Sequence, residues 1–132
     1  MSYEHKSIAA WAAQHGQDPV ELEWKFDHSG VTHLDIGDEG IAGFFGRDIQ
    51  SRSGLFDMLT LMYGLSPEAA TAKTEQIVAE ATGLPLNGVR YDWWPPLLVR
   101  KEGCLYLVAG NIRLAVAQVY RIHHVPVKIL EL

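Results

Sequence analysis

Residues 105–117 read LYLVAGNIRLAVA, and the order of residue types in this stretch decides the fold. The apolar run Leu105–Val108 is typical of a strand, and Gly110-Asn111 forms a tight turn directly after it. The small and helix-forming residues that follow Arg113 indicate a helix. A strand that turns directly into a helix brings unpaired backbone N–H groups and a guanidinium to one corner, which favours a phosphate.

The segments on either side of this stretch predict further strands. Leu97–Val99 and Leu105–Val108 flank the turn Glu102-Gly103, so we expect a hairpin. The chain closes with a predicted strand at Val125–Leu130, whose Pro126 prefers an edge or first-residue position. Cys104, on an alternating strand, is expected to be a small core residue rather than a nucleophile.

Two helices are predicted upstream of the hairpin. The first follows from the helical spacing of Leu55, Met58, Leu59 and Met62 and ends at Gly64. The second begins at Ser66-Pro67-Glu68, which supplies a cap, a first-turn proline and an acid that complements the helix dipole, and it ends at Gly83. Its expected buried stripe comprises Ala70, Thr74, Ile77, Val78 and Ala81.

The N-terminal third carries weaker patterns. We expect a helix from Ser2, as its cap, to His15, and a half-buried strand at Val20–Phe26, where apolar and charged residues alternate. The turn residues 27–30 and a short strand at Val31–Ile36 would complete a hairpin. Residues 37–52 are expected to form a loop with at most one helical turn, and the pair Phe44-Phe45 within it is expected to be exposed.

Composition limits the classes of protein that remain. The 132 residues are 48% hydrophobic, which suffices for one domain over residues 1–132, with a divergent part (1–52), a helical pair (53–83) and a core (84–132). We expect an α+β fold with a small mixed sheet flanked by helices. The net charge of −5 disfavours non-specific adhesion to nucleic acid or membranes, and the absence of a long apolar run suggests an intracellular, cytoplasmic protein.

Taken in order, the proline-led strand after Trp94, the hairpin, the helix start at Gly110-Asn111-Ile112-Arg113 and the closing Val125-Pro126-Val127 strand resemble the ParB/sulfiredoxin superfamily. The resemblance covers about the last 40 residues well, and the helical pair fits loosely. It implies a compact core that binds nucleotide phosphates, with ATP or CTP and Mg²⁺ as the expected ligands. The phosphate-binding residues it suggests are Pro96, Gly110, Asn111, Ile112 and Arg113. Arg90 and Trp94, just before the proline-led strand, are candidates for a further phosphate contact and for a surface on which a base stacks.

Departures from the family pattern narrow the expected activity. Asn111 and Ile112 stand where sulfiredoxin has a cysteine and a histidine, so sulfinic-acid repair lacks its nucleophile. Ile112 also replaces the second arginine of chromosome-partitioning ParB proteins, and no helix-turn-helix is expected, so a sliding DNA clamp is excluded. The corner Gly110-Asn111-Ile112-Arg113-Leu114 resembles that of stand-alone forms from phages and mobile elements. Nucleotide hydrolysis, phosphoryl transfer and nuclease activity, as in other members, are open hypotheses with no assigned catalytic residue.

Several alternatives remain open at this point. The same frame could serve as a catalytically inert protein-interaction or inhibitor module, or as a homodimer, if Trp11, Phe44, Phe45 and Trp93 form an exposed patch. Sequence-specific DNA binding ranks last because no basic recognition helix is present. At least one of Trp93 and Trp94 is expected to cover the core instead of stacking on a base. The acidic turn of Asp35, Asp38 and Glu39 and the pair His123-His124 are expected to be solvated instead of binding a metal.

Overall fold

The strands form one mixed sheet with the order β1-β5-β3-β4-β2 in the computed structural model, which describes residues 3–37 and 40–132. The central strand β3 pairs antiparallel with β4 and parallel with β5. The short strands β1 and β2 lie at the two edges, β1 antiparallel to β5 and β2 parallel to β4. The bounds are Thr32–Leu34 (β1), Ile41–Ala42 (β2), Leu97–Lys101 (β3), Cys104–Ala109 (β4) and Val125–Glu131 (β5). The predicted α+β class with a mixed sheet is therefore confirmed.

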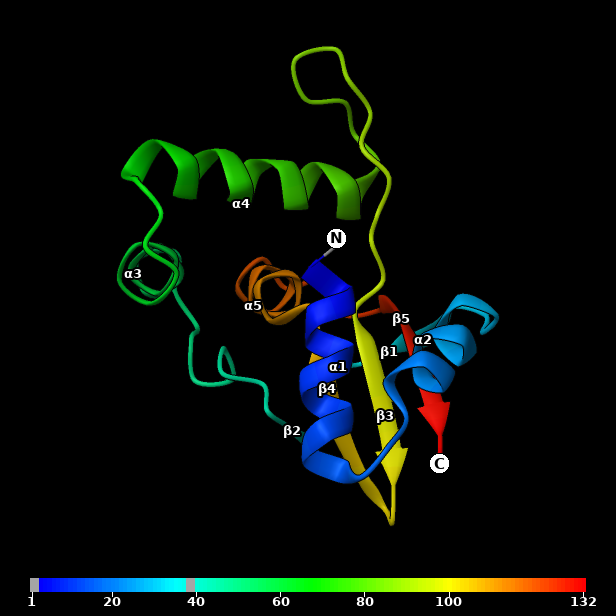
Figure 1. Cartoon of the computed structure of the whole chain (residues 1–132). Helices are drawn as coiled ribbons and strands as arrows, with labels where there is room; N and C mark the ends of the chain where they lie inside the picture. The colour runs from blue at the N-terminus through cyan, green and yellow to red at the C-terminus, as the bar shows by residue number, and fades with distance from the viewer. Residues whose placement is uncertain (1–2, 38–39) are drawn as a thin grey trace.

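Helices cover both faces of the sheet, and the alternation of side chains along β3 explains why (Figure 1). Leu97 and Val99 belong to the core under α1 (Tyr3–His15) and α2 (Pro19–Asp27), whereas Leu98 belongs to the core under α5 (Asn111–Val119). On that second face, α3 (Arg52–Asp57) and α4 (Pro67–Thr82) contact α5, and the π-helix η1 (Met58–Met62) continues α3. Within the described residues, no helix combines the length and apolarity needed to span a bilayer.

The C-terminal part forms the elements that its sequence predicts. The β3–β4 hairpin turns at Glu102 and Gly103, which have φ angles of 53° and 78°. The expected edge or first-residue position of Pro126 is wrong, because Pro126 is the second residue of β5, which lies between β1 and β3. Pro126 pairs with His33 of β1 but lies before the β3 register begins at Lys128, so its missing N–H leaves no ladder position empty. The prediction that Cys104 is a core residue is wrong, because this residue is exposed at the first position of β4.

The predicted strand at Val20–Phe26 is wrong, because this segment is the helix α2. Asp18 caps the helix by accepting a hydrogen bond from the Val20 N–H at 3.0 Å, and Pro19 occupies the first turn. Leu22 and Phe26 are buried while Val20 and Trp24 are exposed. Residues four apart share a face of a helix as well as a face of a strand, so alternation over seven residues could not distinguish the two.

The predicted N-terminal hairpin is also wrong, because residues 27–30 end α2 and β1 pairs with β5 instead of an adjacent strand. The predicted loop at residues 37–52 contains the edge strand β2, and Phe44 within it is buried whereas Phe45 is exposed. The helix at Tyr3–His15 forms as predicted, and its proposed cap Ser2 lies outside the described residues.

The helical pair is confirmed, with one change at the end of its first member and one in the buried stripe of its second. Of the predicted stripe, Ala70 and Ile77 are buried, whereas Thr74, Val78 and Ala81 are only partly buried, and Ala79 and Glu80 are buried as well. Ser66 accepts from the Ala69 N–H at 3.1 Å to cap α4, and Gly83 ends it with φ +71°. In η1 the Tyr63 N–H donates to the Met58 carbonyl, five residues back, instead of four. Because this wider turn rotates the side chains off the α-helical stripe, Met62 is 64% exposed, although its α-helical spacing would place it on the same face as Leu55, Met58 and Leu59.

Candidate anion site at the N-terminus of α5

Gly110 forms the corner between β4 and α5. Its φ of +109° is a conformation that L side chains rarely adopt, and a Cβ at this position would lie 2.7 Å from the Cβ of Pro96. Glycine therefore lets the strand turn into the helix against the proline that precedes β3. No side chain caps the first turn of α5, so the helix begins with backbone N–H groups that a bound anion would satisfy.

A cavity of about 420 Å³ opens at this corner. Its lining includes six of the seven predicted phosphate-binding residues, which are Trp94, Pro96, Gly110, Asn111, Ile112 and Arg113. The seventh, Arg90, lines a neighbouring cavity of about 350 Å³ that shares Trp94 and Arg113 with the first. The structure thus brings the predicted residues together around two adjoining cavities, with Trp94 and Arg113 between them.

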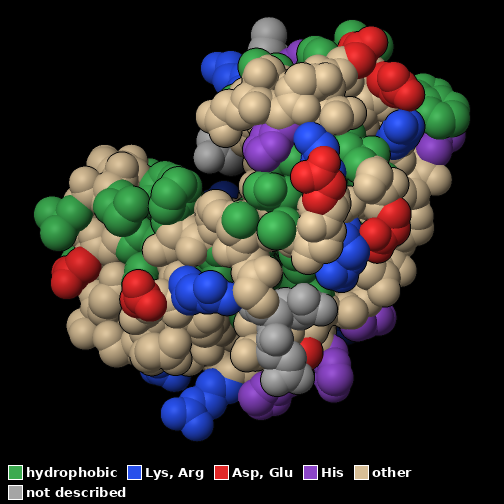
Figure 2. All heavy atoms as spheres, turned by 90° about the horizontal axis from the view of Figure 1, so that it is seen from below, with side chains coloured by type: hydrophobic (Ala, Val, Ile, Leu, Met, Phe, Trp, Pro, Cys, Tyr) green, Lys and Arg blue, Asp and Glu red, His purple; other side chains and the backbone are tan. Residues whose placement is uncertain are grey.

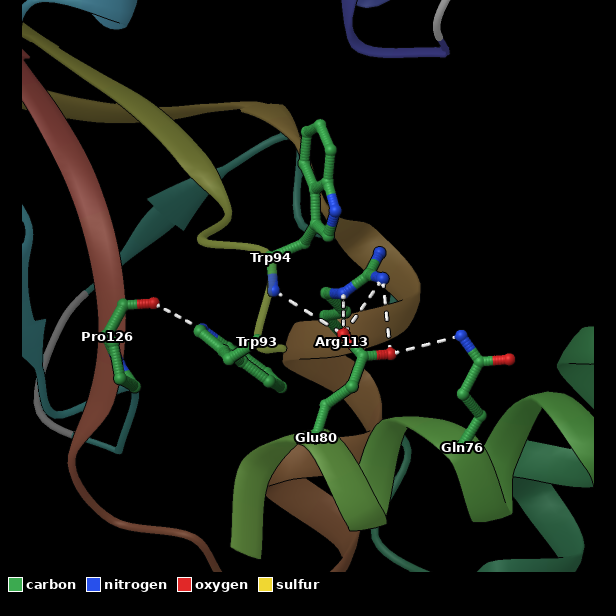
Figure 3. Close-up of polar contacts among 6 residues, drawn as sticks. All are labelled: Gln76, Glu80, Trp93, Trp94, Arg113 and Pro126. Carbon is green, nitrogen blue, oxygen red and sulfur yellow. Dashed lines mark hydrogen bonds and ion pairs between the residues drawn. The ribbon is translucent and has the colours of Figure 1, made fainter. Parts of the chain in front are cut away.

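Arg113 is held by Glu80 of α4 (Figure 3). Its Nε and Nη2 donate to Glu80 Oε1 at 3.4 Å and 3.2 Å, and Nη2 also lies 3.4 Å from Oε2. The Arg113 side chain is 18% exposed, so it extends neither into bulk water nor fully into the core. Within the described part of the chain no residue accepts from Nη1, which leaves that end of the guanidinium for a ligand.

Glu80 connects three parts of the molecule although its side chain is only 1% exposed. Besides Arg113 of α5, its carboxylate accepts from Gln76 Nε2 and from the backbone N–H of Trp94, each at 3.4 Å. A buried carboxylate needs such partners to offset its loss of hydration. Because of them, Glu80 fixes Arg113 relative to the segment that carries Trp94.

Asn111 contributes its backbone to the cavity, since its side chain is engaged elsewhere. Oδ1 accepts from the N–H groups of Phe45 and Gly46 at 2.9 Å and 3.2 Å, and Nδ2 donates to the Tyr63 hydroxyl at 2.8 Å. Two turns further along α5, Gln118 Nε2 lies 2.7–3.0 Å from the carbonyl oxygens of residues 46, 47 and 49. These two side chains fasten the loop before α3 to α5 and so fix one wall of the site.

Three residues of the site escaped the sequence analysis: Tyr63, Lys73 and Glu80. Tyr63 and Lys73 line the first cavity, and Lys73 adds a second cation to that of Arg113. A signal was present, because Lys73 and Glu80 lie four residues before and three after the buried Ile77, on the same helix face. Charged residues at the edge of an apolar stripe are candidates for a site, and the sequence analysis missed Lys73 and Glu80.

The two tryptophans before β3 divide as expected. Trp93 packs against the core and donates from Nε1 to the Pro126 carbonyl at 2.8 Å, whereas Trp94 is 52% exposed (Figure 3). The hypothetical patch of four aromatic residues is wrong, because Trp11 and Phe44 are buried.

Of the acidic turn, the structure describes Asp35 alone. Asp38 and Glu39 lie outside the described residues, and Asp35 accepts from the N–H of Gly37 at 3.0 Å. In the segments 3–37 and 40–132, no three His, Cys, Asp or Glu side chains are grouped as metal ligands.

Comparison with protein-family models, curated proteins and solved structures found no match to this chain. The interpretation of the site therefore depends on its geometry and on the chemistry of its residues.

Proposed function

We propose that this protein binds the phosphate of a nucleotide at the corner between β4 and α5, in the manner of a stand-alone ParB/sulfiredoxin-like protein. The observation that carries the proposal is the cavity of about 420 Å³, which is lined by the uncapped first turn of α5 and by Arg113 and Lys73. Ligand cavities of small molecules usually measure about 300–1,000 Å³. No acidic side chain is part of the lining of this cavity, so its local charge is positive although the chain carries −5 overall.

The composition of the lining also supports a nucleotide rather than a free anion. Most of the wall is apolar, with Pro96 and Ile112 on it and the half-exposed indole of Trp94 at its rim. A flat aromatic surface beside a cationic corner is suited to a ligand that combines a base with a phosphate. The order of the proline-led strand, hairpin, Gly110–Arg113 helix start and closing strand supports the family resemblance in the same region.

Turnover of the nucleotide would need a positioned base or a metal in addition to Arg113. The lining of the first cavity offers Mg²⁺ no carboxylate. Glu80 lies next to the cavity, but both its oxygens accept hydrogen bonds from Arg113 or Gln76. We therefore propose binding as the function and leave hydrolysis and phosphoryl transfer as hypotheses to which no residue is assigned.

Calorimetric titration with ATP, CTP and GTP, each with and without Mg²⁺, tests the proposal. Lys73→Gln should weaken binding about tenfold, because a charge-assisted hydrogen bond to phosphate is lost. Lys101→Gln is the matched control, since Lys101 is also partly buried but lies at the far end of β3. Arg113→Lys, which keeps a cation beside Glu80, should also weaken binding because it removes Nη1. Equal affinity in all four proteins, or no binding of any nucleotide at millimolar concentration, nucleoside monophosphates included, would refute the proposal.

One observation favours a second candidate function, a protein-interaction module. Phe45, Phe56, Leu61 and Met62 expose large apolar side chains, and Leu61 is 81% exposed. Figure 2 shows hydrophobic side chains gathered on the side of the molecule where α3 lies. If this surface mediates self-association, light scattering on a sizing column should give a dimer that Leu61→Lys converts to a monomer. A monomeric wild-type protein would count against self-association through this surface.

A further inference from the structure

The two adjoining cavities carry a small charge surplus that limits which nucleotide fits. Lys73 and Arg113 line the first cavity, and the second adds Arg90 together with the carboxylates of Glu80 and Asp92. Three cations and two carboxylates therefore surround the double site, which leaves one positive charge. The first turn of α5 contributes roughly half a charge more.

We infer that the ligand of this site is a nucleoside monophosphate, bound without a divalent metal ion, rather than a nucleoside triphosphate with Mg²⁺. The inference rests on the proposed function and specifies its ligand. A phosphate monoester carries about −1.5 to −2 charges near pH 7, which the surplus of the site nearly balances. Each further phosphate adds negative charge for which the two cavities hold no additional cation.

The placement of the carboxylates supports the same conclusion. Mg²⁺ in nucleotide sites is usually bound through one or two carboxylates together with the phosphates. Glu80 is 1% exposed and its oxygens already accept from Arg113, Gln76 and the Trp94 backbone. Asp92 lines the second cavity instead of the first, where the uncapped helix begins. Of the two cations in the first cavity, Lys73 and Arg113, Glu80 therefore neutralises Arg113, and it does not serve as a metal ligand.

The aromatic group of the ligand is assigned to Trp94. Its indole is 52% exposed, lines both cavities and lies beside the Arg113 guanidinium (Figure 3). A base stacked there would place the attached phosphate within reach of the first turn of α5. Stacking on an exposed indole accepts any base, so the site selects the number of phosphates more strongly than the base.

Titration of the wild-type protein with AMP, ADP and ATP, each with and without Mg²⁺, tests the inference without any substitution. We expect AMP to bind at least as tightly as ATP and Mg²⁺ to give no gain. ATP that binds more than about tenfold tighter than AMP, or that requires Mg²⁺, would overturn the inference while the proposed function stands. Failure of all three nucleotides to bind at millimolar concentration would overturn both.

Two pairs of variants sharpen the test. Glu80→Gln leaves the charge of Arg113 without its counter-charge and should raise the affinity for ATP relative to that for AMP by about tenfold. The control Glu131→Gln makes the same change of charge near the far end of β3 and should leave this ratio of affinities unchanged. Trp94→Ala should weaken AMP about tenfold and leave ribose 5-phosphate unchanged, and the exposed Trp24 of α2 provides the control substitution. An unchanged preference in Glu80→Gln, with native circular dichroism, would contradict the charge argument.

Discussion

Replacement of Glu80 by methionine tests whether the ion pair with Arg113 holds the site together. Methionine has a similar volume but accepts no strong hydrogen bond, so Arg113, Gln76 and the Trp94 N–H all lose an acceptor. Removal of one partner of a buried ion pair typically costs about 3–5 kcal/mol. Because the Arg113 side chain is 18% exposed, water recovers part of this energy, and we expect the free energy of unfolding to fall by about 2–3 kcal/mol.

Urea unfolding followed by far-UV circular dichroism measures this loss, provided that the slope of the free energy of unfolding against urea concentration is the same in both proteins. Glu131→Met is the matched control, because Glu131 pairs with Arg100 at the surface and exposed pairs contribute less than about 1 kcal/mol. The double variant Glu80→Met/Arg113→Met should be more stable than Glu80→Met alone, since it no longer leaves an unpaired charge in a partly buried position. Equal losses in Glu80→Met and Glu131→Met, or strictly additive losses in the double variant, would refute the reasoning.

The remaining predictions concern the corner and its supports. Gly110→Ala should cost more than about 2 kcal/mol, because it adds a clash with Pro96 to the left-handed strain, whereas Gly83→Ala meets nothing within 4 Å and should cost about 1 kcal/mol in the same urea assay. Asn111→Ala should cost about 1–3 kcal/mol and accelerate hydrogen exchange at the amides of residues 45 and 46; unchanged exchange would show that the loop is held by other contacts. Trp93→Phe removes the hydrogen bond to the Pro126 carbonyl and should cost about 1 kcal/mol by thermal unfolding, and a neutral result would mean that water replaces the indole.

The sequence predicted those elements whose ends carry explicit signals. Helix α4 begins at a serine cap followed by a proline and ends at Gly83, and the structure has the same ends. The strand, corner and helix around Gly110 were predicted because an apolar, strand-like run ends at this glycine and small, helix-forming residues follow it. In α2 the cap Asp18 and Pro19 carry the same kind of signal, but the alternation of residues 20–26 indicates a strand, and the two signals conflict.

The partners of the site residues could not be predicted in the same way. Glu80 lies 33 residues from Arg113 in the chain, and Asn111 lies 65 and 66 residues from the backbone groups that it binds. Such pairs depend on how the helices pack on the sheet, which local patterns do not encode. The sequence therefore indicated which residue types would gather at the corner, but not that a buried carboxylate would take one side of the guanidinium.

The fastening of the early loop to α5 by Asn111 and Gln118 has a consequence for the order in which the protein folds. Closing contacts over a span of 65 to 72 residues costs chain entropy that only later packing repays, so these contacts should form late. The wall of the cavity that this loop forms is then complete only in molecules in which the loop has docked on α5. A ligand of this corner would consequently bind only fully folded molecules, and nascent or truncated chains that lack α5 would not bind it.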